Sequence, residues 1–173
     1  MEIDTAPHSL KTALETLPEA LMPSVVTALE RLPDDTSLPH DDDVLAEIPR
    51  VWAMSDFAAR VCVRDMGILA DLCDSGDLHR AYPEGGFRDR LRHRLEGVGD
   101  EAVLHAALRR FRAREMLRIA WRDLTARADL DDVLADLSEI ADTLIDEALN
   151  WLYPRLCQQI GTPRDDAGNA QQM

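Results

Sequence analysis

The stretch FRAREMLRIAWRDL, residues 111–124, decides the fold that the sequence predicts. Its apolar residues recur every three or four positions, as they do on one face of an α-helix. Residues four apart lie one above the other on such a helix. A single ridge is therefore formed by Arg110, Arg114, Arg118 and Arg122. The chain as a whole has a formal charge of −14, so this concentration of positive charge needs an explanation.

Composition favours helices along the whole chain. Ala, Leu, Arg and Glu are frequent and form helices well, whereas the 173 residues include only 5% aromatic residues and 8 glycines. Two long helical patterns follow each other, at about 100–124 and 131–160. We therefore predict an all-α fold, an irregular helical bundle with two long C-terminal helices.

Prolines and turn residues suggest a domain organisation. Five prolines interrupt residues 1–43, for which we predict an acidic leader with one short helix at 24–32. Residues 44–160 should form a helical domain, and the polar residues 161–173 a flexible tail. Within the domain, Val51, Met54, Ala58 and Cys62 share one helical face. Shorter helices are expected at 68–73 and 87–95.

The last predicted helix has an apolar stripe that should face a core. The stripe consists of Leu130, Val133, Leu134, Leu137, Ile140, Ala141, Leu144, Ile145, Ala148 and Leu152. The acids predicted to lie opposite it are Asp132, Asp136, Glu139 and Asp146. Pro154 should kink or divide this helix.

The arginine ridge has two interpretations. Residues 88–122 contain ten arginines and five acids, and repulsion between like charges four apart favours nearby anions. These anions could be internal, with Glu115, Asp123, Asp131 and Asp142 as candidates. They could instead be a phosphate or an acidic surface outside the chain, because the arginine fork suits both. The sequence leaves both interpretations open.

Nothing in the sequence predicts a catalytic or metal-binding site. The cysteines Cys62, Cys73 and Cys157 lack C-x-x-C spacing, and the histidines are scattered. The acidic composition argues against binding to nucleic acid, and no apolar run is long enough to cross a membrane. We expect a cytoplasmic helical scaffold or interaction module.

Several segments resemble one family. FRAREMLRIAWRDL (111–124), LADLSEIADTLIDEALNWLY (134–153) and GTPRDDAGNAQ (161–171) resemble the bifunctional glutamine synthetase adenylyltransferase/adenylyl-removing enzymes of bacteria. VWAMSDFAARVCVRD (51–65) and LADLCDSGDLHRAY (69–82) are similar to the N-terminal region of that family. The resemblance implies an enzyme that transfers AMP to a tyrosine of glutamine synthetase and removes it by phosphorolysis. It also implies control by glutamine and the PII signalling protein, and nucleotidyltransferase domains that use ATP and magnesium.

In that family, the segment similar to 161–171 leads into a nucleotidyltransferase domain with metal-binding aspartates. This sequence contains none of those residues, so we expect a helical part that precedes a missing catalytic domain. It should be inactive alone, with no catalytic residue and no cofactor of its own. Glutamine synthetase and PII would be partners through the parent enzyme, and Arg114 and Arg118 would lie close to its phosphate-handling domain. The alternative is a stand-alone helical adaptor that binds an acidic protein.

Overall fold

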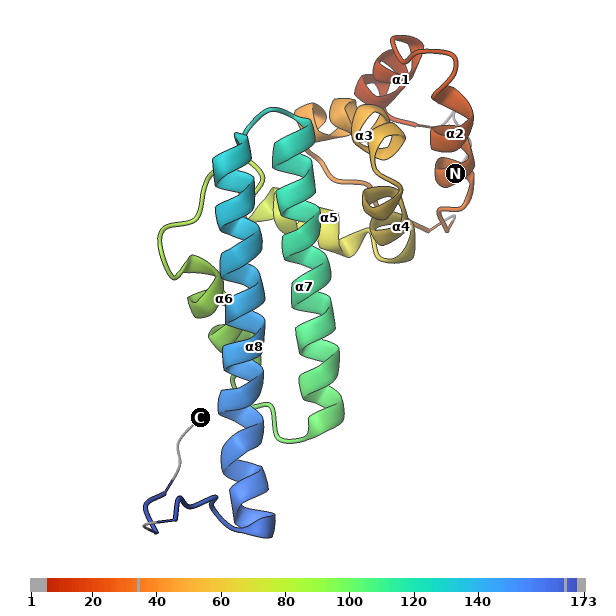
Figure 1. The fold of residues 1–173 in the computed structure, drawn as a ribbon. Coiled ribbons are helices and arrows are strands. Elements are labelled where there is room, and N and C mark those ends of the chain that lie inside the picture. Colours follow the sequence, from red (N-terminus) through yellow and green to blue (C-terminus); the bar gives the residue numbers. More distant parts are fainter. Residues whose placement is uncertain (1–5, 34, 167, 171–173) are drawn as a thin grey trace. The chain divides into compact units, whose positions relative to one another are not determined.

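The computed structural model describes residues 6–33, 35–166 and 168–170. This part of the chain contains eight helices and no strand, which confirms the predicted all-α class and the two long C-terminal helices (Figure 1). The helices are α1 (His8–Glu15), α2 (Met22–Glu30), α3 (Asp42–Met54), α4 (Asp56–Arg64), α5 (Gly67–Asp74), α6 (Gly86–Leu95), α7 (Glu101–Leu124) and α8 (Leu130–Ile160).

The chain divides into two compact units. Unit 1 comprises the residues up to Tyr82 together with Ala113–Leu137, and unit 2 comprises Pro83–Arg112 and the residues from Ser138 onward. Unit 1 therefore holds α1 to α5, the end of α7 and the start of α8, whereas unit 2 holds α6 and the remainder of α7 and α8.

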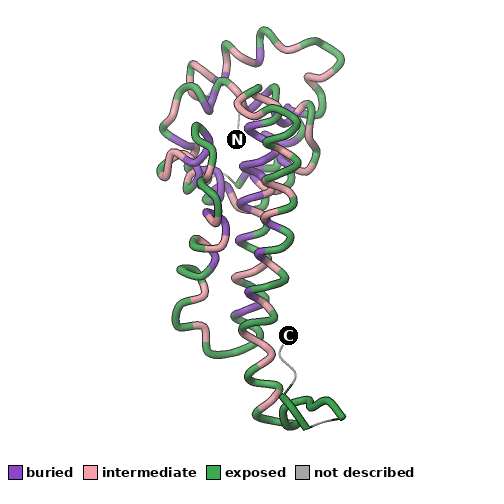
Figure 2. Tube along the Cα trace, turned by 60° about the vertical axis from the view of Figure 1, so that its left-hand side comes forward, coloured by how far each residue is buried: buried purple, intermediate pink, exposed green. Residues whose placement is uncertain are grey.

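The core of unit 1 is built mainly from α1 to α5. The side chains of Leu10, Leu29, Ile48 and Trp52 are at most 1% exposed, and α7 adds Leu117 and Trp121 to the same cluster. In Figure 2, buried positions recur through this part of the tube between exposed ones. Unit 2 has a smaller set of fully buried apolar side chains, Phe87, Leu91, Leu104 and Phe111.

Two tryptophans tie loops and helices together within the units. In unit 1, Trp121 Nε1 on α7 donates to Glu47 Oε2 on α3 at 2.7 Å. In unit 2, Trp151 Nε1 on α8 donates to the carbonyl of Val98 at 3.1 Å. The ring of Trp121 is buried and that of Trp151 is half-buried, and each indole has a satisfied N–H group.

The proline-rich leader contains more helix than predicted. The helix expected at 24–32 is present as α2, with Pro23 in its first turn, but α1 was missed. α1 follows directly after Pro7 and buries Leu10 and Leu14. Proline is compatible with a helix start, so these prolines delimit two short helices that are stabilised by packing.

The helical pattern from Val44 to Cys62 is not one helix. Ser55 adopts an extended conformation with φ −144° and ψ 98°, and its Oγ accepts from Ala58 N at 3.2 Å. This hydrogen bond caps α4 and separates it from α3. Ala58 and Cys62 are buried as predicted, but Met54, at the break, is 58% exposed.

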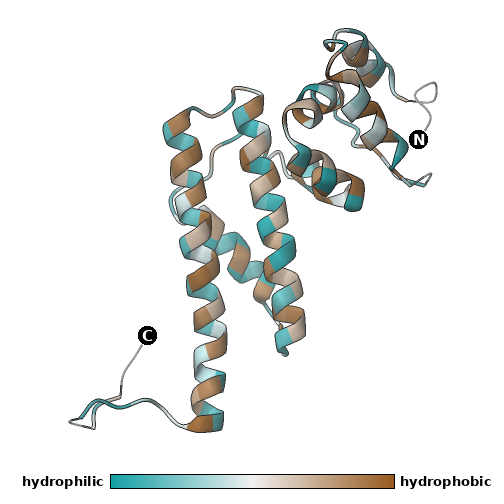
Figure 3. Ribbon diagram, turned by 45° about the vertical axis from the view of Figure 1, so that its right-hand side comes forward, coloured by the Kyte–Doolittle hydropathy of each residue, from teal (hydrophilic) through white to brown (hydrophobic). Residues whose placement is uncertain are grey.

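Helix α8 buries only part of the predicted apolar stripe. Leu130, Leu134 and Ile145 of the predicted stripe are 70%, 53% and 59% exposed, and apolar residues recur along α8 in Figure 3. Of the predicted stripe, Ile140 is buried, and the other buried positions of α8 are Thr143 and Glu147, which the stripe does not include. The reason is that acidic side chains of α8 pair with arginines of other helices, as described below. The helix also continues through Pro154 to Ile160, so Pro154 does not divide it.

Candidate functional site

The predicted arginine ridge lies on α7, and three of its four members are buried. Arg114, Arg118 and Arg122 are 3%, 0% and 4% exposed, whereas Arg110 is exposed. Arg110 belongs to unit 2 and the other three belong to unit 1. The structure therefore brings three of the predicted residues into one interior and leaves the fourth at the surface.

The turn after α5 supplies the partners of these arginines. Gly76 has φ +68°, a conformation that glycine adopts without a steric penalty. The turn that follows, in which Asp77 N donates to Leu72 O at 3.2 Å, leaves Asp77 only 1% exposed. We call the resulting group the buried arginine cluster. It consists of Asp71, Ser75, Asp77, Arg80, Tyr82, Arg114, Glu115, Arg118 and Asp136.

The cluster provides a hydrogen-bond acceptor for every N–H donor of the Arg114 guanidinium group. A guanidinium group has five N–H donors. Nε of Arg114 donates to Asp71, and Nη1 donates to Glu115 Oε1 at 2.7 Å and to Tyr82 Oη at 3.0 Å. Nη2 donates to Asp77 Oδ2 at 2.8 Å and to Ser75 Oγ at 3.0 Å. Burial lowers the pKa of Arg114, but Glu115, Asp71 and Asp77 raise it by more, so the net shift is upward.

Arg118 connects α7 to the loop after α5 and to α8. Its Nε and Nη2 donate to the carbonyls of Asp77 and Arg80 at 3.0 and 2.7 Å. Its Nη1 donates to Asp136 Oδ2 at 2.9 Å, and its guanidinium carbon lies 3.6 Å from the centre of the Tyr82 ring. A planar guanidinium can make both kinds of contact. Arg118 therefore fixes the backbone of this loop.

The hydrogen bond between Tyr82 and Glu115 depends on the protonation of the Glu115 carboxyl group. Tyr82 Oη lies 3.0 Å from Asp77 Oδ2 and 3.0 Å from Glu115 Oε2, but a hydroxyl has only one proton to donate. Both contacts are hydrogen bonds when the Glu115 carboxyl is protonated and donates to Tyr82. Burial raises the pKa of Glu115, which favours that form.

Arg122 is less well paired. Its Nη2 donates to the carbonyl of Arg127 at 3.1 Å, and its Nε is buried without a hydrogen-bond partner in the described part of the chain. Burial is the main cause that lowers the pKa of Arg122, and the positive charge of Arg118 adds to it. Within the described part of the chain, the side chain of Arg122 is therefore a buried charge with a single hydrogen bond.

Of the four carboxyl groups that contact Arg114 and Arg118, sequence reasoning identifies one and misses three. The sequence pattern indicates Glu115 as a partner but not Asp71 or Asp77, and it predicts that Asp136 points away from the core. The other named candidates, Asp123, Asp131 and Asp142, are exposed. The sequence feature that could have indicated these partners is the segment DLCDSGD (71–77), which places three acids around the glycine after α5. The internal interpretation of the ridge describes Arg114 and Arg118, whereas contact with an outside anion stays a prediction.

The charged side chains of the buried arginine cluster pair with one another inside unit 1. Among the described residues no three His, Cys, Asp or Glu side chains are arranged to hold a metal ion. Burial raises the pKa of the Cys62 thiol, and of the Cys73 thiol, to about 12. Neither cysteine is thus a thiolate at neutral pH.

No helix in the described ranges combines the length and the apolar character needed to cross a bilayer.

Comparisons with known proteins agree with the resemblance seen in the sequence. The family described as glutamate-ammonia ligase adenylyltransferase matches residues 45–173. Three relatives are each named bifunctional glutamine synthetase adenylyltransferase/adenylyl-removing enzyme. The protein of Thioalkalivibrio sulfidiphilus is 39% identical over 168 residues, which cover 94% of this chain and 17% of the relative. That of Pseudomonas aeruginosa is 43% identical, covering 88% of this chain and 15% of the relative.

A third relative, from Pseudomonas syringae pv. tomato, is 48% identical over 66% of this chain and 12% of its own length. The chain thus spans less than a fifth of the relatives that it matches. These matches do not favour the alternative of a stand-alone adaptor. Since the family match covers well over half of the chain, the chain belongs to the glutamate-ammonia ligase adenylyltransferase family.

Proposed function

We propose that this chain serves as the N-terminal helical part of an enzyme that attaches AMP to glutamine synthetase and removes it. The observation that carries the proposal is the identity of 39–43% maintained over 88–94% of the chain with two relatives named for these activities. The finer features come from the family resemblance. They are transfer of AMP from ATP to a tyrosine, phosphorolytic removal, use of magnesium, control by PII and a cytoplasmic location.

In this proposal the helical part contributes a rigid support and not reacting groups. The donors of Arg114 are all used within unit 1, and Arg118 holds the carbonyls of the loop after α5. A buried ion pair with satisfied hydrogen bonds favours one arrangement of the elements that it joins. The cluster would hold α5, α7 and α8 in a fixed relationship within unit 1.

Arg110 is the ridge member for which contact with an outside phosphate or acidic surface stays part of the proposal. Its side chain is exposed on α7, and an exposed arginine can reach either kind of anion. Arg114, Arg118 and Arg122 would act indirectly, through the position of the helices that carry them.

A chimaeric enzyme tests the proposed function. The matched 152-residue segment of the Pseudomonas aeruginosa relative is replaced by the corresponding residues of this chain. Incorporation of labelled AMP into glutamine synthetase and its release in the presence of phosphate are then measured. We expect both activities to be retained, because the replaced segment supplies support only.

The control is a second chimaera that carries Arg118→Met, which should fold less stably and lose activity in proportion. The proposal fails if the first chimaera is folded and binds glutamine synthetase but neither adds nor removes AMP. Retention of both activities when the segment is deleted outright would equally contradict it.

A further inference from the structure

A groove between α2 and α4 has no role in the proposed function. It has a volume of about 700 Å³ and lies entirely within unit 1. Its apolar lining includes Ala28, Ala59 and Val63. Small-molecule sites commonly have volumes of about 300–1,000 Å³ and combine an apolar surface with a few polar groups. The size and lining of this groove match that description.

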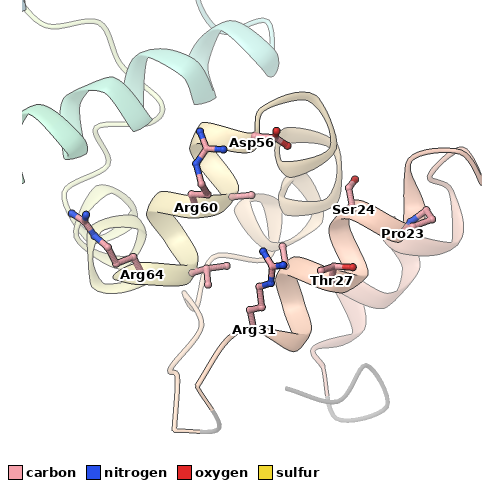
Figure 4. Close-up of a pocket in the computed structure, with 10 residues that line it drawn as sticks. Pro23, Ser24, Thr27, Arg31, Asp56, Arg60 and Arg64 are labelled. Carbon is pink, nitrogen blue, oxygen red and sulfur yellow. The ribbon is translucent and has the colours of Figure 1, made fainter.

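Three arginines surround the groove. Figure 4 shows Arg60 and Arg64 extending from α4 and Arg31 from the end of α2, with Pro23 and Ser24 further along α2. The side chains of all three arginines are exposed and make no hydrogen bond or ion pair within the described ranges 6–33, 35–166 and 168–170. Their donors are therefore available to a ligand.

Interaction with a helix dipole explains the positions of only two of these three arginines. Arg31 follows the last residue of α2 and Arg64 ends α4, where a positive charge interacts favourably with the helix dipole. Arg60 lies in the middle of α4 and gains nothing from the dipole. Asp56, four residues earlier, lines the same groove yet forms no ion pair with Arg60 among the described residues. Arg60 therefore lines the groove without an ion-pair partner among the described residues.

The charges and hydroxyls of the groove suit a phosphate group. Three arginines and Asp56 give the lining a formal charge of +2, and a phosphate monoester has a charge of about −1.5 to −2 at pH 7. Thr27 adds a hydroxyl that makes no hydrogen bond with the described residues, whereas Ser24 already donates to Leu21 O at 2.8 Å. Phosphate oxygens accept hydrogen bonds from both guanidinium and hydroxyl groups.

We propose that the groove between α2 and α4 binds a small organic phosphate. The phosphate oxygens accept from Arg31, Arg60, Arg64 and Thr27, and the apolar part of the ligand rests on Ala28, Ala59 and Val63. Asp56 accepts a hydrogen bond from a hydroxyl or amino group of the ligand. This site is separate from the buried arginine cluster, whose guanidinium groups are engaged inside unit 1.

Isothermal titration of the 173-residue chain with phenyl phosphate tests the proposal. Phenol, inorganic phosphate and phenylacetate serve as parallel probes of the ring, the phosphate and a carboxylate. We expect phenyl phosphate to bind more tightly than each of the other three. AMP and glucose 6-phosphate then distinguish a nucleoside from a sugar as the attached group, and binding of either supports the proposal.

Matched variants locate the binding. Arg60→Gln should weaken phenyl phosphate binding by about tenfold or more, because one charged hydrogen-bond donor is lost. Arg112→Gln makes the same change in charge at an exposed position of α7 outside the groove, and should leave the affinity unchanged. Ala59→Phe fills the groove and should abolish binding, with thermal unfolding used to verify that the variant is folded.

Two results would overturn the inference. One is the absence of saturable binding with a Kd below about 1 mM for every organic phosphate tested. The other is an equal loss of affinity in Arg60→Gln and Arg112→Gln, which would indicate unspecific attraction of anions. Neither result affects the proposed enzyme function, since no part of it uses this groove.

Discussion

Arg114 Nη2 and Asp77 Oδ2 lie 2.8 Å apart, and their side chains are only 4% and 2% exposed. The two residues are separated by 37 positions in the sequence. Their pairing fixes the loop after α5 against α7 inside unit 1. An ion pair this deeply buried contributes little net stability while intact, but removal of one partner leaves the other charge without compensation.

Replacement of Arg114 should therefore destabilise the chain strongly. We expect Arg114→Met to lower the free energy of unfolding by about 3–5 kcal/mol, because Asp77 and Glu115 lose their buried cation. Arg112→Met, two positions away and exposed, should change it by less than about 0.5 kcal/mol. Urea denaturation measures both, and equal effects of the two substitutions would show that the cluster is not the cause.

Protonation of Glu115 should make stability depend on pH. Burial raises the pKa of Glu115 in the folded state above its ordinary value of 4.5. The folded state therefore binds this proton more tightly than the unfolded state, so stability decreases as the pH rises from 4.5 through the raised folded pKa. Glu115→Gln keeps a neutral hydrogen-bonding group and lacks this dependence.

The measurement is the free energy of unfolding of both proteins across that pH range. The wild-type chain should lose stability relative to Glu115→Gln as the pH increases. A difference between the two that stays constant with pH would contradict a protonated Glu115 in the folded state.

The inward face of α8 can be tested by truncating side chains on its two sides. Ile140 is 3% exposed and Ile145 is 59% exposed. Ile140→Ala should cost about 2–5 kcal/mol as a core truncation, whereas Ile145→Ala should cost less than about 0.5 kcal/mol. Thermal unfolding compares them, and the reverse order would contradict the inward position of Ile140 on α8.

The break between α3 and α4 depends on one capping hydrogen bond. Ser55→Ala removes the acceptor for Ala58 N and should lower stability by about 1 kcal/mol. Ser37→Ala, at an exposed position outside the helices, serves as the control. If Ser55→Ala were neutral or stabilising, the separation of the two helices would have another origin.

The sequence predicted the positions of the helices better than the hydrogen-bond partners of the arginine ridge. The all-α class and the approximate bounds of the two long helices, predicted at 100–124 and 131–160 and observed as α7 and α8, follow from composition and helical periodicity. The partners of the arginine ridge do not. Asp71 and Asp77 lie 43 and 37 positions before Arg114, and only tertiary packing brings them to it.

The error in α8 has a physical cause. An apolar stripe identifies the most hydrophobic side of a helix, but the side that is buried depends on what the neighbouring helices offer. Arg118 on α7 pairs with Asp136 at 2.9 Å in unit 1, and Arg92 on α6 pairs with Glu147 at 2.9 Å in unit 2. These pairs satisfy acids on a face that periodicity alone classifies as polar and outward.

The placement of the indole rings offers an optical way to observe the two units one at a time. The chain has three tryptophans, of which Trp52 and Trp121 lie in unit 1 and Trp151 lies in unit 2. Replacing Trp151 with phenylalanine would restrict the intrinsic fluorescence to unit 1, and a chain with Trp151 alone would report on unit 2. Emission spectra recorded during denaturation would then reveal whether both units melt together or in sequence.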